Sequence, residues 1–114
     1  MTARELYEKL RPLQEAKGQY FNADMDMTMD LLASLLVNKE RYGFMACPCR
    51  LASGTFALDK DIVCPCAYRD ADVADFGACF CGLYVSKALH DAAKPAPVVE
   101  ERRPVEKTLA ALGG

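Results

Sequence analysis

Residues 47–81 read CPCRLASGTFALDKDIVCPCAYRDADVADFGACFC and contain every cysteine of the chain. The six cysteines form three Cys-x-Cys pairs, Cys47-Pro48-Cys49, Cys64-Pro65-Cys66 and Cys79-Phe80-Cys81. A cuboidal iron–sulfur cluster is held by four thiolates. The two thiols that remain are what a reversible disulfide requires. The count therefore predicts a cluster together with a redox-active dithiol.

Two other uses of the six cysteines stay open at this point. Structural zinc sites commonly use Cys-x2-4-Cys, because the longer loop lets both sulfurs reach one tetrahedral ion. The Cys-x-Cys spacing is tighter, and one zinc ion would leave two cysteines over. A framework of structural disulfides is typical of exported proteins. The N-terminal residues MTARELYEKLRP are charged and contain no apolar export segment, so we expect a cytoplasmic protein with reduced thiols.

Length and composition indicate a small domain with a modest core. The chain has 114 residues, and alanine supplies 17 of its hydrophobic positions. Few large apolar side chains remain to cover the surface of a domain this small, and small scaffolds commonly add a metal centre. The net charge of −2 argues against a general nucleic-acid binder. No apolar stretch approaches the roughly 20 residues that span a membrane.

Helical patterns dominate on both sides of the cysteines, and we expect a small, mostly α-helical domain wrapped around an iron–sulfur cluster. The predicted helices are residues 3–17, a helix from Asp24 to Gly43, a short helix from Asp70 through Phe76 stopped by Gly77, and a marginal helix over 105–112. We expect residues 1–94 to form the cluster-binding catalytic domain. Residues 95–114, with three prolines and many charges, are expected to be a surface tail.

The order of the three pairs resembles the catalytic subunit of ferredoxin–thioredoxin reductase, whose signature is CPC, CPC and then CHC. The resemblance covers CPCRLASG (47–54), DIVCPCAYRD (61–70) and GACFCGLYVS (77–86). Weaker likeness extends to ERYG before the first pair and to ERRP near the C-terminus. The gaps of fourteen and twelve residues differ from those of the plant-type enzymes. The chain is therefore most similar to the bacterial or archaeal branch.

The resemblance implies a role for each sulfur that spacing alone does not select. It implies that a 4Fe-4S cluster is bound by four cysteines, Cys47, Cys64, Cys66 and Cys79. It implies that Cys49 and Cys81 form the redox-active disulfide. In the family, the counterpart of Cys49 attacks the target and the counterpart of Cys81 interacts with the cluster.

Three residues near or outside the motif have open roles. Phe80 stands where the family usually has a histidine linked to proton handling, a role that phenylalanine cannot take. Arg50 directly follows Cys49, and a nearby guanidinium favours the thiolate form; a solvated arginine or a surface ion pair fits the sequence equally well. His90, the only histidine, lies outside the pairs and is expected to be structural.

The expected function is that of an oxidoreductase, a ferredoxin-dependent reductase of a disulfide in thioredoxin or a thioredoxin-like protein. Ferredoxin would be the electron donor, and a small variable subunit is a further possible partner. Lys60 and Arg69 flank the second pair and would either meet an acidic ferredoxin or be ordinary surface charges. The chief alternative is a single-cluster electron carrier without disulfide reductase activity. A zinc-stabilised interaction module is the third class.

Overall fold

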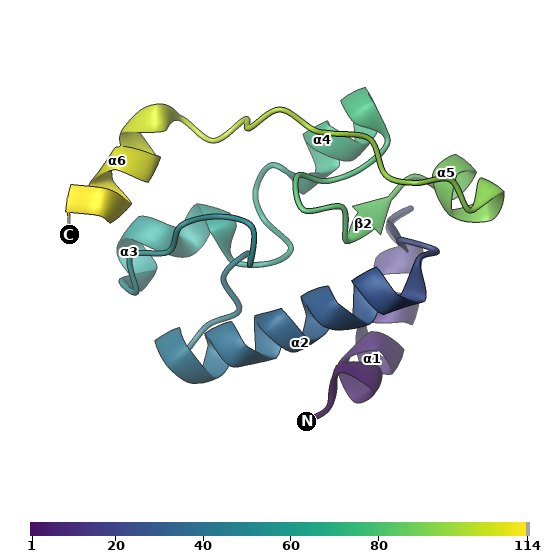
Figure 1. Cartoon of the computed structure of the whole chain (residues 1–114), viewed down its shortest axis with the longest axis horizontal. Helices are drawn as coiled ribbons and strands as arrows, with labels where there is room; N and C mark the ends of the chain where they lie inside the picture. Colours follow the sequence, from purple (N-terminus) through teal and green to yellow (C-terminus); the bar gives the residue numbers. More distant parts are fainter. Residues whose placement is uncertain (114) are drawn as a thin grey trace.

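The computed structural model describes residues 1–113, which are mostly helical (Figure 1). In chain order the elements are α1 (Ala3–Glu15), β1 (Tyr20–Phe21), α2 (Met25–Tyr42), α3 (Phe56–Asp59), the 3-10 helix η1 (Lys60–Ile62), α4 (Arg69–Phe76), β2 (Tyr84–Val85), α5 (Lys87–Ala92) and α6 (Val105–Gly113). The mostly helical class predicted from the sequence is confirmed. None of these helices, within the part of the chain that is described, is both long enough and apolar enough to cross a membrane.

The first helix begins at a capping box that sequence reasoning did not single out. The Glu5 amide donates to the Thr2 hydroxyl at 3.1 Å, and the Thr2 amide donates to the Glu5 carboxylate at 3.2 Å. These bonds satisfy N–H groups that the first turn leaves unpaired. Leu6 of this helix is buried, whereas Leu13 is exposed and the neighbouring Gln14 is buried.

The second helix begins and ends where the sequence predicts. The Met27 amide donates to the Asp24 carboxylate at 3.1 Å, so Asp24 is the N-cap. Gly43, with φ of 87°, ends the helix in a left-handed conformation that favours glycine. Leu32 and Leu35 are fully buried in the core that α2 shares with α1. This arrangement delivers the chain directly to the first cysteine pair.

A two-stranded antiparallel sheet ties the N-terminal part to the third cysteine pair. Tyr20 pairs with Val85 and Phe21 with Tyr84. The rings of Phe21 and Tyr84 stack with centroids 5.0 Å apart. Asn22 extends this connection, because its side-chain amide donates to the carbonyl of Gly82 at 2.9 Å in the buried interior. The turn carrying the third pair is therefore anchored to the core.

The short helix after the second pair starts earlier than predicted. It begins at Arg69 rather than after Asp70, and its N-cap position is Tyr68, which makes no side-chain capping bond. Asp70 does not cap the helix, because its carboxylate accepts hydrogen bonds from the Arg69 and Gln19 side chains. The predicted end at Gly77 is confirmed.

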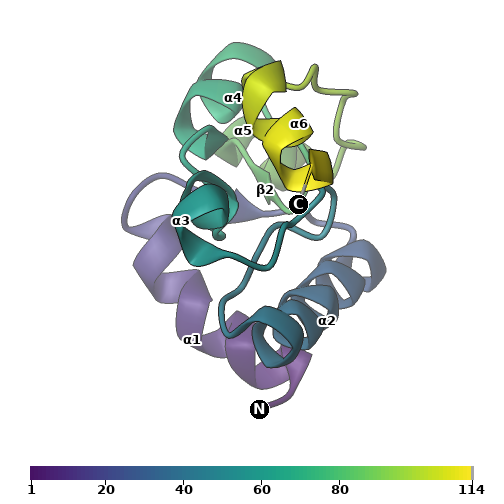
Figure 2. The same cartoon turned by 90° about the vertical axis from the view of Figure 1, so that its left-hand side faces the viewer.

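The C-terminal segment returns across the molecule rather than extending away from it. Figure 1 shows the chain running from α5 past α4 to α6, and α6 packs against α3. Figure 2 shows α6 on the same side as α4, opposite the crossing of α1 and α2. Val99 and Arg103 are buried, so residues 99–103 contact the domain through side chains of both kinds. The division of the chain at residue 94 stays a prediction.

Candidate functional site

Backbone hydrogen bonds set the first and second cysteine pairs side by side. The Cys47 amide donates to the Ile62 carbonyl at 2.8 Å, and the Cys64 amide donates to the Met45 carbonyl at 2.8 Å. Ala46 and Val63 form the antiparallel bridge between these bonds. Residues 45–47 and 62–64 are thereby paired, so that Cys47 and Cys64 lie on neighbouring segments.

The third pair lies in a tight turn between α4 and β2. The Cys79 amide donates to the Tyr84 carbonyl at 2.9 Å, and the Tyr84 amide donates to the Cys79 sulfur at 3.3 Å. The Gly82 amide closes the turn on the Cys79 carbonyl at 2.9 Å. Cys79 is buried, and both its amide and its sulfur form hydrogen bonds with the Tyr84 backbone, so its sulfur has a fixed position.

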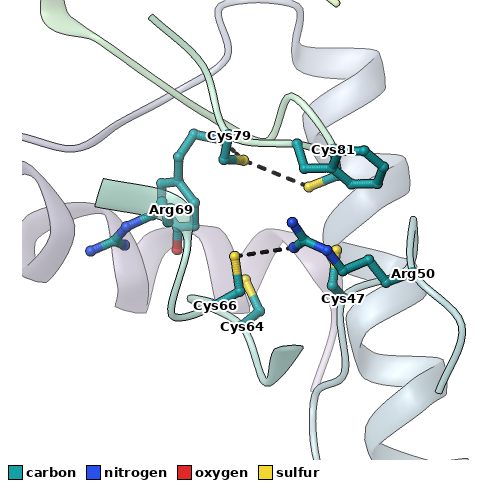
Figure 3. A pocket seen from close by; sticks show the side chains of 9 residues that line it. Cys47, Arg50, Cys64, Cys66, Arg69, Cys79 and Cys81 are labelled. Carbon is teal, nitrogen blue, oxygen red and sulfur yellow. Dashed lines mark hydrogen bonds between the residues drawn. The ribbon is translucent and has the colours of Figure 1, made fainter. Parts of the chain in front are cut away.

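Five of the six cysteines line one pocket. Figure 3 shows Cys79 and Cys81 on one side of this pocket and Cys47, Cys64 and Cys66 on the other. The full lining, which we call the sulfur pocket, is Cys47, Arg50, Cys64, Cys66, Arg69, Cys79, Phe80, Cys81 and Tyr84. Cys49, the sixth cysteine, is exposed and does not line it.

The two cysteines proposed from the family pattern as the dithiol differ in environment. The neighbouring thiols of Cys47 and Cys81, as hydrogen-bond donors, lower the pKa of Cys49 to about 3. Hydrogen bonding to Cys47, Cys49 and Cys79 raises the pKa of Cys81. The exposed Cys49, whose pKa is lowered, therefore lies near Cys81, whose pKa is raised, an arrangement suited to nucleophilic attack by Cys49.

The remaining sulfurs are buried to different degrees. The Cys79 and Cys81 sulfurs are 3.7 Å apart, and this hydrogen bond lowers the pKa of Cys79 to about 7. Burial raises the pKa values of the Cys64 and Cys66 thiols. Such thiols would lose their protons readily only on binding a cation, since metal binding requires the deprotonated form.

Arg50 contacts the second pair rather than its sequence neighbour Cys49. Its Nη1 donates to the Cys66 sulfur at 3.2 Å, and its Nε and Nη2 donate to the Glu101 carboxylate at 2.8 Å each. Of the causes that lower the Cys49 pKa, the Arg50 charge is the weakest. The solvated arginine considered from the sequence is wrong, since the side chain is only 2% exposed.

The donor set suits an iron–sulfur cluster, whose irons are held by cysteine thiolates. Five cysteines line the sulfur pocket. Within residues 1–113, no group of three His, Cys, Asp or Glu side chains is arranged as the site of a single metal ion.

An unpartnered hydroxyl also belongs to the sulfur pocket. Tyr84 is 1% exposed, and its hydroxyl has no hydrogen-bond partner among the described residues. A buried hydroxyl without a partner is unfavourable, so an acceptor bound in the pocket would satisfy it. Burial also raises the pKa of this phenol, which keeps the proton available for donation.

Sequence reasoning placed Arg69 on the surface and missed Glu101 as a residue of the site. Arg69 is buried, and its Nη1 donates to the side-chain amide oxygen Oε1 of Gln14 at 2.5 Å, so it is not the surface charge considered from the sequence. The only sequence signal for Glu101 is its place in ERRP. His90 lies elsewhere, with its Nδ1 bonded to the Phe21 carbonyl oxygen at 2.7 Å, which agrees with a structural role.

Comparison with known proteins identifies one family. The family model described as ferredoxin thioredoxin reductase catalytic beta chain matches residues 3–108 of the chain. The match therefore includes all three pairs and most of the C-terminal segment. Comparison with curated proteins gave no match.

Proposed function

The chain belongs to the ferredoxin thioredoxin reductase catalytic beta chain family, and from this membership we propose that it reduces a disulfide in thioredoxin or a thioredoxin-like protein with electrons from ferredoxin. The observation that carries the proposal is the division of the six cysteines. Five sulfurs line one pocket, while Cys49 is exposed and adjoins Cys81. Such a division supplies both a binding site for a redox group and an accessible nucleophile.

We infer that a 4Fe-4S cluster is held by Cys47, Cys64, Cys66 and Cys79. The support is that these four sulfurs lie on opposite sides of the sulfur pocket (Figure 3). When bound, the cluster supplies one-electron chemistry, which suits ferredoxin as a donor that delivers electrons singly. The burial of the Cys47 and Cys79 side chains, each 4% exposed, would keep water away from it.

The two thiols outside this set carry out the exchange reaction. The Cys49 thiolate attacks one sulfur of the partner's disulfide, which forms a mixed disulfide and releases the partner's other sulfur as a thiolate. Cys81 then gives its proton to the partner's released thiolate and attacks the Cys49 sulfur. The Cys49–Cys81 disulfide forms, and the partner's second sulfur takes a proton from solvent, so that the partner leaves as a dithiol. Two electrons pass from the protein to its partner. Two electrons from ferredoxin restore the dithiol.

The surroundings of the site support this division of roles. Cys49 is accessible to a protein-sized substrate, whereas Cys81 is only partly exposed and packs against the core. Protonated Cys81 can stabilise the Cys49 thiolate until the partner arrives. We propose a cytoplasmic location, because the dithiol must be kept from permanent oxidation. A small variable subunit is a further proposed partner, and nucleic acids and membranes are not.

The proposal is tested in two stages. Anaerobically purified protein should contain about four irons and four sulfides per chain, with the absorption and EPR spectra of a cluster. A colourless protein with one tightly bound zinc would refute the proposed cofactor. Alkylation of the reduced protein should then modify two thiols beyond the cluster ligands. Cluster-loaded protein that has no such thiols and does not reduce thioredoxin would instead be a simple electron carrier.

A further inference from the structure

Arg50 is a buried cation whose position is set by three separate parts of the chain. Its side chain is 2% exposed, although it follows the exposed Cys49 directly. A buried charge is costly unless it is paired and hydrogen-bonded. Glu101 provides the pairing through two parallel hydrogen bonds of 2.8 Å, the bidentate geometry that suits a guanidinium. These bonds join residues 51 positions apart.

Aromatic rings cover the faces of the same guanidinium. Its central carbon lies 4.6 Å from the centre of the Phe80 ring and 5.1 Å from that of Tyr68. Both distances are within the range of favourable cation–π contacts. Phe80 belongs to the third cysteine pair and Tyr68 follows the second, so the cation is enclosed by the segments that carry the sulfurs.

One edge of the guanidinium is left to face the sulfur pocket. Nε and Nη2 are bonded to Glu101, while Nη1 donates to the Cys66 sulfur at 3.2 Å (Figure 3). A guanidinium stays charged at all physiological pH values. The Cys66 sulfur therefore has a permanent positive charge beside it.

We propose that Arg50 is a positioning residue, held by Glu101, that places a fixed positive charge on the Cys66 sulfur and so raises the reduction potential of the group bound in the sulfur pocket. This inference rests on the proposed function, since Cys66 is a proposed ligand of the cluster. Net charge and hydrogen bonds to the ligand sulfurs are among the factors that set such potentials. A nearby cation favours the more negative, reduced state.

The test is a redox titration of cluster-loaded protein, followed by optical or EPR spectroscopy. For Arg50→Gln we expect a shift to lower potential equal to about tenfold in the one-electron equilibrium constant, ~59 mV. Arg50→Lys should shift the potential in the same direction but by less. An ammonium group keeps the charge but cannot reproduce the bidentate hydrogen bonds of the guanidinium. Arg4→Gln is the control, since Arg4 pairs with Glu8 on the exposed surface of α1. Its potential should equal that of the wild type.

The contribution of Glu101 is measured by a double-mutant cycle. If Glu101 positions Arg50, the Arg50→Gln shift should be much smaller in a Glu101→Gln background than in the wild type. An equal shift in both backgrounds would overturn the role of Glu101. An unchanged potential in Arg50→Gln with a full complement of iron would overturn the whole inference and leave the proposed function intact. Wild-type protein without iron or sulfide would refute the proposed function itself.

Discussion

The Arg103 guanidinium donates to the Asp61 carboxylate at 2.9 Å, and both side chains are buried. A second bond between them measures 3.3 Å, and the Tyr68 hydroxyl donates to the same carboxylate at 2.6 Å. Arg103 also donates to the Leu58 carbonyl at 3.2 Å. The C-terminal segment is thus fastened to the residues that precede the second cysteine pair.

We expect Arg103→Met to destabilise the protein by about 3–5 kcal/mol, because it leaves Asp61 buried without its cation. Chemical unfolding followed by circular dichroism gives the free energy of unfolding. Arg4→Met is the control, since its pair with Glu8 is exposed on both sides and should contribute less than about 1 kcal/mol. Equal losses in the two variants would show that the buried pair is not important for stability.

Replacing Cys64 or Cys66 with serine should remove the cluster and much of the fold. The core of this domain is small, and the free energy of metal binding is then also free energy of folding. Iron and sulfide analysis after anaerobic purification provides the measurement, and Cys49→Ser, which should keep its iron, is the control. Full iron content in either variant would exclude that cysteine from the ligand set.

Cys81→Ser should keep the cluster and trap a thioredoxin-like partner covalently through Cys49, because removal of the resolving thiol leaves the mixed disulfide intact. Cys49→Ser should keep the cluster and trap nothing. Mass spectrometry of the adduct identifies the linked cysteine. A partner trapped through Cys81 would reverse the two roles, and loss of iron from either variant would mean that the ligand set is wrong.

Gly82→Ala should cost more stability than Gly18→Ala. Both glycines have φ of 79°, so both substitutions should cost about 1–2 kcal/mol for left-handed backbone. An added Cβ at Gly82 would also lie 2.8 Å from the Met27 methyl, whereas nothing lies within 4 Å at Gly18. Repacking should add about 1 kcal/mol. The free energies of unfolding of the two variants provide the measurement. Equal values would show that the turn around Gly82 accommodates the added methyl group without loss of stability.

Local signals in the sequence predicted much of the framework. Asp24, Gly43 and Gly77 act as predicted, because a cap or a helix stop depends on its immediate neighbours. The three pairs also led us to expect the cysteines close together, and five of the six line one pocket. The start of α4 was missed, because the carboxylate of Asp70 found partners other than its own helix.

Long-range side-chain pairing was beyond prediction from a single sequence. Arg69 looked like a surface charge, yet its partner Gln14 comes from α1, 55 positions earlier. Glu101 looked like part of a solvated tail, yet it pairs with Arg50. No periodicity or spacing records such contacts, because each depends on how distant segments are brought together.

The return of residues 99–103 across the molecule has a consequence for biosynthesis. The ribosome makes the chain from its N-terminus, so all six cysteines are synthesised before Glu101 and Arg103 exist. During that interval the buried Arg50 side chain lacks its counter-ion and Asp61 lacks its cation. The sulfur-bearing segments are then less firmly closed than in the finished protein. The contacts of Glu101 and Arg103 with the cysteine segments therefore form only after all three pairs have been made.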